Sequence, residues 1–455
     1  MAKSRQQYVC SDCGAVSPKW SGQCAECQAW NTLVESVVAP SPKGARAGFA
    51  GAASDSRVEV LSEVQAERQH RAPTGNVEFD RVLGGGLVPG SVILIGGDPG
   101  IGKSTLLLQV TAAVAEGLPA LYVSGEESLQ QIAMRGQRLG LELDAIRCLA
   151  ETSVEKILSV AEQEKPALMI IDSIQTMYTD TLQSAPGSVA QVRETAAALV
   201  RYAKQRHTGV LLVGHVTKEG GIAGPRVLEH MVDAVLYFEG DGSSRHRVIR
   251  SLKNRFGAAN ELGVFAMTET GLKAISNPSA LFLSGHNRDT PGSTVTVAWE
   301  GTRPLLIELQ ALVAESNLGN PRRLAVGVDQ QRLVMQLAVL QRQGGLSTYD
   351  QDVFVNAVGG IRIGETAADL PLLLAVRSSF TDRALPSDLV AFGEVGLAGE
   401  IRPVPYGEER LKEAAKHGFR RAIVPRRNRP KSGSGSKIDI EVVAVERLDQ
   451  ALEAV

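Results

Sequence analysis

The sequence predicts an α/β protein with a mainly parallel central sheet, a small cysteine-rich module before it and a second α/β domain after it. Short apolar runs alternate with helix-length segments from about residue 58 onward, which is the pattern of parallel strands joined by crossover helices. Four of the five cysteines lie within the first 27 residues, ahead of that pattern. Because 455 residues exceed what one core normally organises, we expect two or three domains.

The overall charge is nearly balanced, with 48 basic and 50 acidic residues and a formal net charge of -2. A chain of this charge does not coat nucleic acid by bulk electrostatics, so any nucleic-acid site has to be local. The N-terminal residues MAKSRQQYVC contain no apolar signal segment, and no stretch approaches the ~20 apolar residues of a membrane span. We therefore expect a cytoplasmic protein with no membrane partner.

The cysteine-rich module, residues 1–36, contains two C-x-x-C pairs: Cys10, Cys13, Cys24 and Cys27. Two such turns can bring four thiolates to one point, which predicts a four-cysteine zinc ribbon that binds Zn²⁺. Four protein ligands fill the coordination sphere, so the metal is structural; a redox role for the thiols is the alternative. Trp20 and Trp30 provide the large apolar cover, so metal binding has to stabilise the module. Residues 37–57, rich in Pro, Gly, Ala and Ser, predict a flexible linker.

The run VILIGGDPGIGKST at residues 92–105 matches the phosphate-binding pattern G-x-x-x-x-G-K-[ST]. An apolar strand at 92–95 precedes it and apolar residues at helical spacing follow, so the order is strand, loop and helix. Glycines let backbone N–H groups surround phosphate oxygens, the helix N-terminus adds positive charge, Lys103 reaches the terminal phosphates and Ser104 holds Mg²⁺. A chance glycine-rich turn is the alternative. The predicted ATP-binding residues are Gly97, Asp98, Pro99, Gly100, Ile101, Gly102, Lys103, Ser104 and Thr105.

Two further strands end in carboxylates that suit ATP hydrolysis. Residues 120–124 lead to Glu126 and Glu127, and an acid at the carboxyl end of a strand beside the phosphate loop can orient the attacking water. We assign this role to Glu126, with Glu127 as the second choice; an acid that only complements a helix dipole is the alternative. Residues 167–171 lead to Asp172, placed as a Walker-B acid that holds Mg²⁺ through water.

The following strands lead to a candidate sensor and to a basic motif. Residues 210–213 form a buried strand followed by His215 and a glycine-rich loop, a segment suited to sense phosphate; a structural histidine is the alternative. Residues 234–238 and 246–252 predict paired strands. They end in the pentapeptide KNRFG: Lys253, Asn254, Arg255, Phe256 and Gly257.

The cysteine pairs, the loop GDPGIGKST and KNRFG, in this order, resemble the RadA (Sms) family of bacterial DNA repair proteins over essentially the full chain. The resemblance implies a RecA-like P-loop ATPase domain at residues 58–283, assembled as a homo-hexamer ring. It also implies binding of single-stranded and branched DNA, branch migration during homologous recombination, and action beside the RecA recombinase. Lys253 and Arg255 would reach ATP bound by the neighbouring subunit, where a cation pair can neutralise transition-state charge. A solvated basic turn is the alternative.

By analogy with RecA-like cores, Glu126 corresponds to the catalytic acid and His215 to the polar sensor. The loops at 176–189 and 218–226 follow the third and fourth strands, and in a RecA-like ring such loops line the central channel. The predicted phosphate contacts to DNA are Lys218, Arg226 and Arg193. Tyr178 offers the one aromatic face there, so we expect tracking of the DNA backbone and not base readout.

Residues 284–455 resemble the Lon-protease domain, an α/β fold, most clearly over 352–455. Lon-type hydrolysis needs a nucleophilic serine and a lysine that takes its proton. The corresponding positions hold residues without that chemistry: Leu372 for the serine, and Glu408 and Arg410 for the lysine, with Ser378 and Ser379 further along as poor substitutes. The resemblance therefore implies a proteolytically inactive binding or assembly module.

The sequence thus predicts a DNA-dependent ATPase, a ring motor that moves DNA strands by hydrolysing ATP at subunit interfaces. Two other classes of function stay open. One is a RecA-like assembly switch that is controlled by nucleotide and does not translocate on DNA. The other is an ATP-dependent protease, which the missing serine and lysine disfavour. The expected cofactors are ATP, Mg²⁺ and Zn²⁺.

Overall fold

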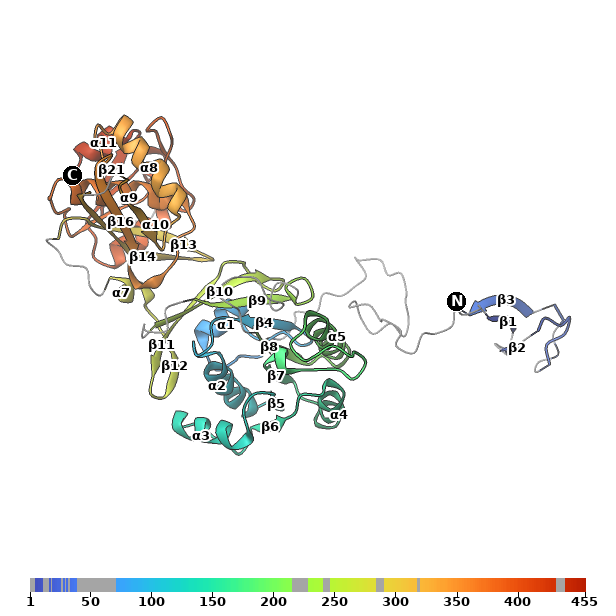
Figure 1. Ribbon diagram of the computed structural model, residues 1–455. Coiled ribbons are helices and arrows are strands. Elements are labelled where there is room, and N and C mark those ends of the chain that lie inside the picture. Colours follow the sequence, from blue (N-terminus) through green and yellow to red (C-terminus); the bar gives the residue numbers. More distant parts are fainter. Residues whose placement is uncertain are drawn as a thin grey trace. The chain divides into compact units, whose positions relative to one another are not determined.

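The computed structural model describes residues 71–214, 228–239, 246–283, 290–316, 320–430 and 438–455, together with residues 5–10, 16–17, 19–25, 28, 30–31 and 33–38 near the N-terminus. The chain divides into two compact units, Met1–Arg57 and Val58–Val455. In Figure 1 their residues can be followed by the colours, which run along the sequence. Within the described ranges, no helix combines the length and the apolar character needed to cross a membrane.

The N-terminal unit is built on a small antiparallel sheet in the order β2-β1-β3. Its strands are β1 (Arg5–Cys10), β2 (Val16–Ser17) and β3 (Leu33–Val38). Strand β3 therefore runs two residues into the predicted linker, because Val37 and Val38 pair with β1. Trp20 and Trp30 are 57% and 69% exposed, so they do not provide the apolar cover expected of them. Their exposure strengthens the argument that burial alone cannot stabilise this unit.

The larger unit begins with a twisted sheet in the order β12-β11-β10-β9-β4-β8-β7-β5-β6 (Figure 1). The strands from β9 to β6 in this order are parallel, and β10, β11 and β12 extend one side as an antiparallel meander. The strand bounds are β4 Val92–Gly96, β5 Ala120–Ser124, β6 Arg147–Ala150, β7 Leu168–Asp172, β8 Gly209–Val213, β9 Ala234–Glu239, β10 His246–Asn254, β11 Leu262–Thr268 and β12 Gly271–Ala274. The predicted mainly parallel sheet is confirmed.

Helices cover both faces of this sheet, because its central strands are apolar on both sides. One face packs on α1 (Val77–Leu83), α2 (Lys103–Ala115) and α3 (Leu129–Leu139), whose buried side chains form one core cluster with the strands. The other face packs on α4 (Val154–Glu164) and α5 (Val189–Arg206). The arrangement places the carboxyl ends of the parallel strands, and the loops that follow them, at one edge.

The C-terminal domain contains a mixed sheet in the order β15-β16-β14-β13-β17-β20-β21. Its strands are β13 Ser293–Glu300, β14 Arg303–Glu315, β15 Arg323–Val326, β16 Gln351–Ala357, β17 Leu389–Ala391, β20 Arg421–Pro425 and β21 Glu441–Val445. Helices α8 (Gln330–Gln343), α9 (Asp369–Phe380) and α11 (Leu448–Glu453) pack on one face. Helix α10 (Gly407–Lys416) packs on part of the other face. The α/β character predicted for this region is confirmed.

The two α/β domains share buried contacts. Val248 and Val264 of the first sheet belong to the same apolar cluster as the core of the C-terminal domain. The guanidinium of Arg303 also donates two hydrogen bonds to the buried carboxylate of Glu78, at 3.1 and 2.8 Å. These contacts join the two α/β domains into one compact unit.

Candidate active site

The loop between β4 and α2 forms a backbone cradle that requires glycine. Gly97 has φ of 148° and Gly102 has φ of 116°, in the region that side chains rarely adopt. A Cβ atom on Gly97 would lie 2.8 Å from Cβ of Phe238, and one on Gly102 would lie 2.8 Å from Cε of Met267. Strands β9 and β11 thus support the loop from behind, and the open side at Pro99 and Gly100 is exposed. Such a cradle fits the phosphates of a nucleotide.

Lys103 begins α2 and turns its side chain back into this loop. The residue is only 3% exposed, and Nζ donates to the carbonyl oxygens of Gly97 at 2.7 Å and Asp98 at 2.9 Å. Burial lowers the pKa of Lys103, while Asp172, Asp98 and Glu126 act against that shift. Ser104 and Thr105 follow in the first helical turn and are half-buried. The cation therefore sits among the loop and the acidic groups of the neighbouring strands.

Asp172 ends β7 and is 6% exposed. Its carboxylate oxygen Oδ2 accepts a hydrogen bond of 2.5 Å from the hydroxyl of Tyr122 on β5. Burial raises the pKa of Tyr122 well above its usual value and Asp172 adds to the shift, so the phenol stays protonated and keeps donating. The sequence analysis missed Tyr122. The signal was a tyrosine in the middle of a buried strand, because a buried tyrosine hydroxyl needs a partner.

The structure separates the roles available to Glu126 and Glu127. Glu126 is exposed at the carboxyl end of β5, and Oε1 accepts a hydrogen bond from the hydroxyl of Ser173. Glu127 instead forms an ion pair with Arg135 on α3. The carboxylate of Glu127 is therefore occupied by Arg135, whereas the charge of Glu126 acts on Lys103. His215, predicted as the sensor, lies outside the described residues.

Strand β10 connects this loop to the KNRFG motif. At its start, the guanidinium Nε of Arg247 donates to the carbonyl of Ile101 in the loop at 2.9 Å, and Arg247 is 5% exposed. At its end, Asn254 pairs with Ala234, which also pairs with Ile93 near the start of β4. KNRFG consequently lies near the amino end of β4, whereas the phosphate loop of the same chain follows the carboxyl end of β4. Sequence reasoning did not find Arg247, because β10 contains three cations and no local pattern shows which of them is buried.

The motif itself is built into a turn by its side chains. Asn254 Nδ2 donates to the carbonyl of Val82 at 3.2 Å, and its Oδ1 accepts from the backbone N–H of Phe256 at 2.8 Å. Gly257 packs against Gly84, and an added Cβ would lie 2.7 Å from the Gly84 Cα. Lys253 and Arg255 are thereby presented on a fixed turn, with the Arg255 side chain 58% exposed.

Comparison with known proteins assigns all three parts of the chain. A model described as an AAA domain matches residues 63–221, one for a rubredoxin metal binding domain matches 8–35, and one for subunit ChlI of Mg-chelatase matches 328–428. The DNA repair protein RadA of Pseudomonas aeruginosa is 61% identical over 455 residues, covering 100% of this chain and 99% of the relative. That of Escherichia coli K12 is 59% identical over 457 residues, covering 99% of each. The chain belongs to the DNA repair protein RadA family.

The predicted family and the P-loop ATPase domain are confirmed, and this RadA-family chain is an ATPase of DNA repair. A solved structure, the KaiC-like protein PH0186 from Pyrococcus horikoshii OT3, matches 46% of this chain and 99% of its own at 19% identity, with a TM-score of 0.39. The order of the three matched regions is also the order in which the sequence predicts them.

The predicted DNA contacts of the RadA-family chain are only partly described. Arg193 is exposed on α5, while Lys218 and Arg226 lie outside the described residues. The loop at 176–189 follows β7 and is fixed by Gln191, whose Nε2 donates to carbonyl oxygens of Thr179, Leu182 and Ser184. This loop leaves the same sheet edge as the phosphate loop.

Of the four predicted zinc ligands in the N-terminal module, only Cys24 has a described side chain, so the zinc site stays a prediction. Cys24 is buried, and a tight turn closes beside it because the Gln28 N–H donates to the Cys24 carbonyl at 3.0 Å. The backbone of Cys10 ends β1. The side chain of Cys10, and all of Cys13 and Cys27, lie outside the described residues. Buried thiols on tight turns suit a tetrahedral thiolate site.

The former protease positions of the C-terminal domain carry structural contacts. Leu372 is buried in α9, Ser378 Oγ accepts from the N–H of Gly292 at 2.9 Å, and Ser379 Oγ accepts from that of Val313 at 2.9 Å. Arg410 is fully buried, and its guanidinium binds both carboxylate oxygens of Glu365 at 2.7 and 2.6 Å. Glu408 forms a surface ion pair with Lys412. These groups offer neither a nucleophile nor a base to a peptide bond.

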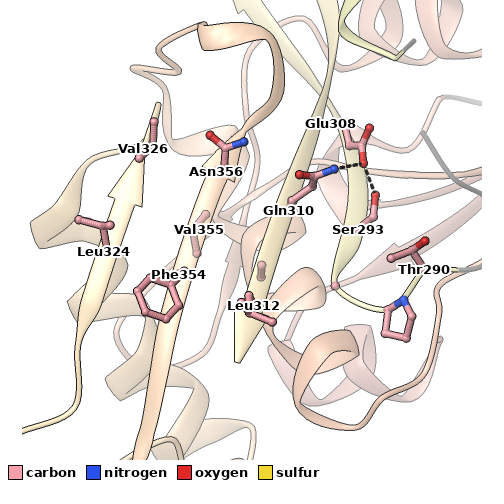
Figure 2. Close-up of a pocket in the computed structure, with 13 residues that line it drawn as sticks. Thr290, Ser293, Glu308, Gln310, Leu312, Leu324, Val326, Phe354, Val355 and Asn356 are labelled. Atoms are coloured by element: carbon pink, nitrogen blue, oxygen red, sulfur yellow. Dashed lines mark hydrogen bonds between the residues drawn. The ribbon is translucent and has the colours of Figure 1, made fainter. Parts of the chain in front are cut away.

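A separate pocket of about 420 Å³ opens on the sheet face formed by β13, β14, β15 and β16 (Figure 2). Apolar side chains line one side, namely Leu312, Leu324, Val326 and Phe354. On the other side, Glu308 accepts hydrogen bonds from Ser293 at 2.7 Å and Gln310 at 2.9 Å. The described residues that line the pocket include no lysine or arginine. An acidic, largely apolar pocket does not suit nucleotide phosphates, so the nucleotide site remains the loop after β4.

Proposed function

We propose that this RadA-family ATPase is a DNA-dependent ring motor that couples ATP hydrolysis at subunit interfaces to branch migration of recombination intermediates. The observation that carries the proposal is the position of KNRFG relative to the phosphate loop. Along β4 the two are about 10 Å apart at strand spacing, and Lys253 points still further away, to the turn before β9. Cations so placed serve a nucleotide that is bound by a neighbouring copy.

In this proposal, ATP is held by the loop from Gly97 to Thr105, with Lys103 against the terminal phosphates. When bound, Mg²⁺ supplies positive charge at the phosphates, and Ser104 and Asp172 hold it. Glu126 orients the attacking water, and its contact with Ser173 fixes the carboxylate for that task. Lys253 and Arg255 of the neighbouring copy neutralise charge in the transition state, and His215 senses the phosphate state.

The DNA-binding part of the proposal uses the loops that leave the nucleotide edge of the sheet. Single-stranded and branched DNA would pass through a homo-hexamer ring, with Arg193, Lys218 and Arg226 contacting phosphates. The RecA recombinase is the proposed partner in the cytoplasm, and the zinc-bound N-terminal module and the proteolytically inactive C-terminal domain provide binding and assembly surfaces. The family membership supports action on DNA in repair.

The experiment measures ATP hydrolysis by the wild type, Lys253→Ala and Arg255→Ala, each with and without single-stranded DNA, together with branch migration of a synthetic junction. We expect DNA to stimulate the wild type, and both variants to bind nucleotide but to lose stimulation and strand movement. Normal junction processing by Lys253→Ala would refute the role in trans. If DNA changes the hydrolysis rate of neither the wild type nor the two variants, an assembly switch that does not translocate is favoured.

A further inference from the structure

The turn that precedes β9 binds both cations of KNRFG within one chain. Lys253 Nζ donates to the carbonyl oxygens of Glu229 at 2.6 Å and Val232 at 2.8 Å. Arg255 Nη1 lies 3.2 Å from Oδ1 of Asp233, and the Arg255 backbone N–H donates to the Asp233 carbonyl at 3.1 Å. Lys253 and Arg255, which would reach a neighbouring nucleotide, are therefore also bound within their own subunit.

Asp233 is fixed in place from two other sides. It is 4% exposed, and its Oδ2 accepts hydrogen bonds from Lys204 Nζ at 2.6 Å and from the backbone N–H of Val92 at 3.0 Å. The Asp233 N–H in turn donates to the Val92 carbonyl at 2.8 Å. Helix α5 and the start of β4 thus hold one carboxylate oxygen, and the other oxygen faces Arg255.

The resulting ion pair is asymmetric, since the Asp233 side chain is 6% exposed and the Arg255 side chain is 58% exposed. Water competes for the exposed guanidinium, so the pair is weak and Arg255 can leave at low cost. When it leaves, Lys204 still neutralises Asp233, and no unpaired charge is left buried. Burial and the nearby Arg255 lower the pKa of Lys253.

We propose that Asp233 is a positioning residue that holds Arg255 retracted in its own subunit until the nucleotide of the neighbouring subunit competes for it. The inference rests on the proposed function, because it requires Arg255 to act in trans. Retracted and extended positions form a two-state equilibrium, and phosphate on the neighbouring subunit shifts it toward extension. Asp233 therefore sets how often Arg255 reaches the neighbouring nucleotide, and in the proposed motor DNA would act on this same equilibrium.

The test is the Asp233→Asn variant, which keeps the shape and an acceptor oxygen but removes the charge. We expect hydrolysis without DNA to rise about two- to fivefold, the range of a weak exposed ion pair, and the stimulation by single-stranded DNA to fall by the same factor. The KM for ATP should stay within about twofold, because the phosphate loop is unchanged. Glu162→Gln is the matched control, since it makes the same acid-to-amide change at the exposed pair with Arg206 and should leave both rates unchanged.

The same substitution in an Arg255→Ala background separates positioning from a general structural effect. If Asp233 acts through Arg255, Asp233→Asn changes nothing in that background. An equal rise in both backgrounds, or no rise in either, would overturn the proposal. If Arg255→Ala alone leaves DNA-stimulated hydrolysis intact, it is the proposed function that fails. If Asp233→Asn does not fold, Asp233→Glu is the second variant, because it keeps the charge and moves the carboxylate by one methylene. Its hydrolysis is then compared in the wild-type and Arg255→Ala backgrounds in the same way.

Discussion

Replacing Tyr122 by phenylalanine tests whether the hydroxyl on Asp172 matters for ATP hydrolysis. The side chain is 1% exposed, and the substitution removes one oxygen without changing the packing of the ring. The lost hydrogen bond is 2.5 Å long and ends on a buried carboxylate. Water cannot replace it, because Tyr122 is closed off from solvent. A hydrogen bond to a charged group contributes about 1.5–3 kcal/mol, and each 1.4 kcal/mol corresponds to about a tenfold change.

If the bond serves to orient Asp172, we expect kcat to fall by about tenfold or more and the half-saturating Mg²⁺ concentration to rise. The KM for ATP should change by less than about twofold, because Lys103 and the glycine cradle are untouched. The assay is phosphate release over a Mg²⁺ titration. Tyr202→Phe is the control, since Tyr202 is another largely buried tyrosine of the same domain, on α5. A Tyr122→Phe variant with wild-type or higher kcat and an unchanged Mg²⁺ titration would refute the reasoning.

Four further predictions follow from the same structure. Lys103→Ala should abolish hydrolysis, measured as phosphate release, because it removes the ammonium proposed to neutralise the phosphates; a rate within about tenfold of the wild type would contradict the assignment. Gly97→Ala should weaken ATP binding in a fluorescent-nucleotide titration, because its Cβ would lie 2.8 Å from that of Phe238; unchanged affinity would show that the loop can shift freely. Arg410→Lys should destabilise the C-terminal domain by about 1.5–3 kcal/mol in thermal unfolding, because lysine keeps the charge but cannot make the paired contact with Glu365; a wild-type melting curve would contradict this. Metal analysis should find about one zinc per chain, and Cys24→Ser should lower that content while leaving basal hydrolysis intact; zinc-free wild-type protein would refute the site.

The strands and the phosphate loop could be predicted from local pattern. Apolar runs between glycine-rich loops locate β4, β5, β7 and β8 to within one residue at each end, because buried parallel strands need uninterrupted apolar side chains. The RadA family could also be predicted from the sequence, because its motifs are short continuous runs of residues. What pattern alone could not supply is the set of partners that each polar side chain finds across the sheet.

The contacts that were missed join residues far apart in the chain. Tyr122 meets Asp172 only because β5 and β7 are neighbours in a particular register, and Arg247 meets Ile101 only because β10 lies beside β9. The choice between two adjacent acids is of the same kind. Arg135 removes Glu127 from consideration, and that ion pair depends on the direction in which α3 leaves the sheet. Side-chain partners across strands are set by tertiary register, which no local pattern contains.

The location of β10 inside the sheet has a mechanical consequence. Its residues from Val248 to Arg250 pair with β9 on one side and with β11 on the other, whereas the register with β9 shifts between Ser251 and Lys253. From Arg247 to Lys253 it spans about 20 Å, with the contact to the chain's own phosphate loop at one end and the motif proposed to act on a neighbour's nucleotide at the other. The doubly paired part of β10 therefore moves with the phosphate loop, and the register shift is the place where the strand can bend before KNRFG. In the proposed ring, this connection would run from the nucleotide of each subunit toward that of one neighbour only.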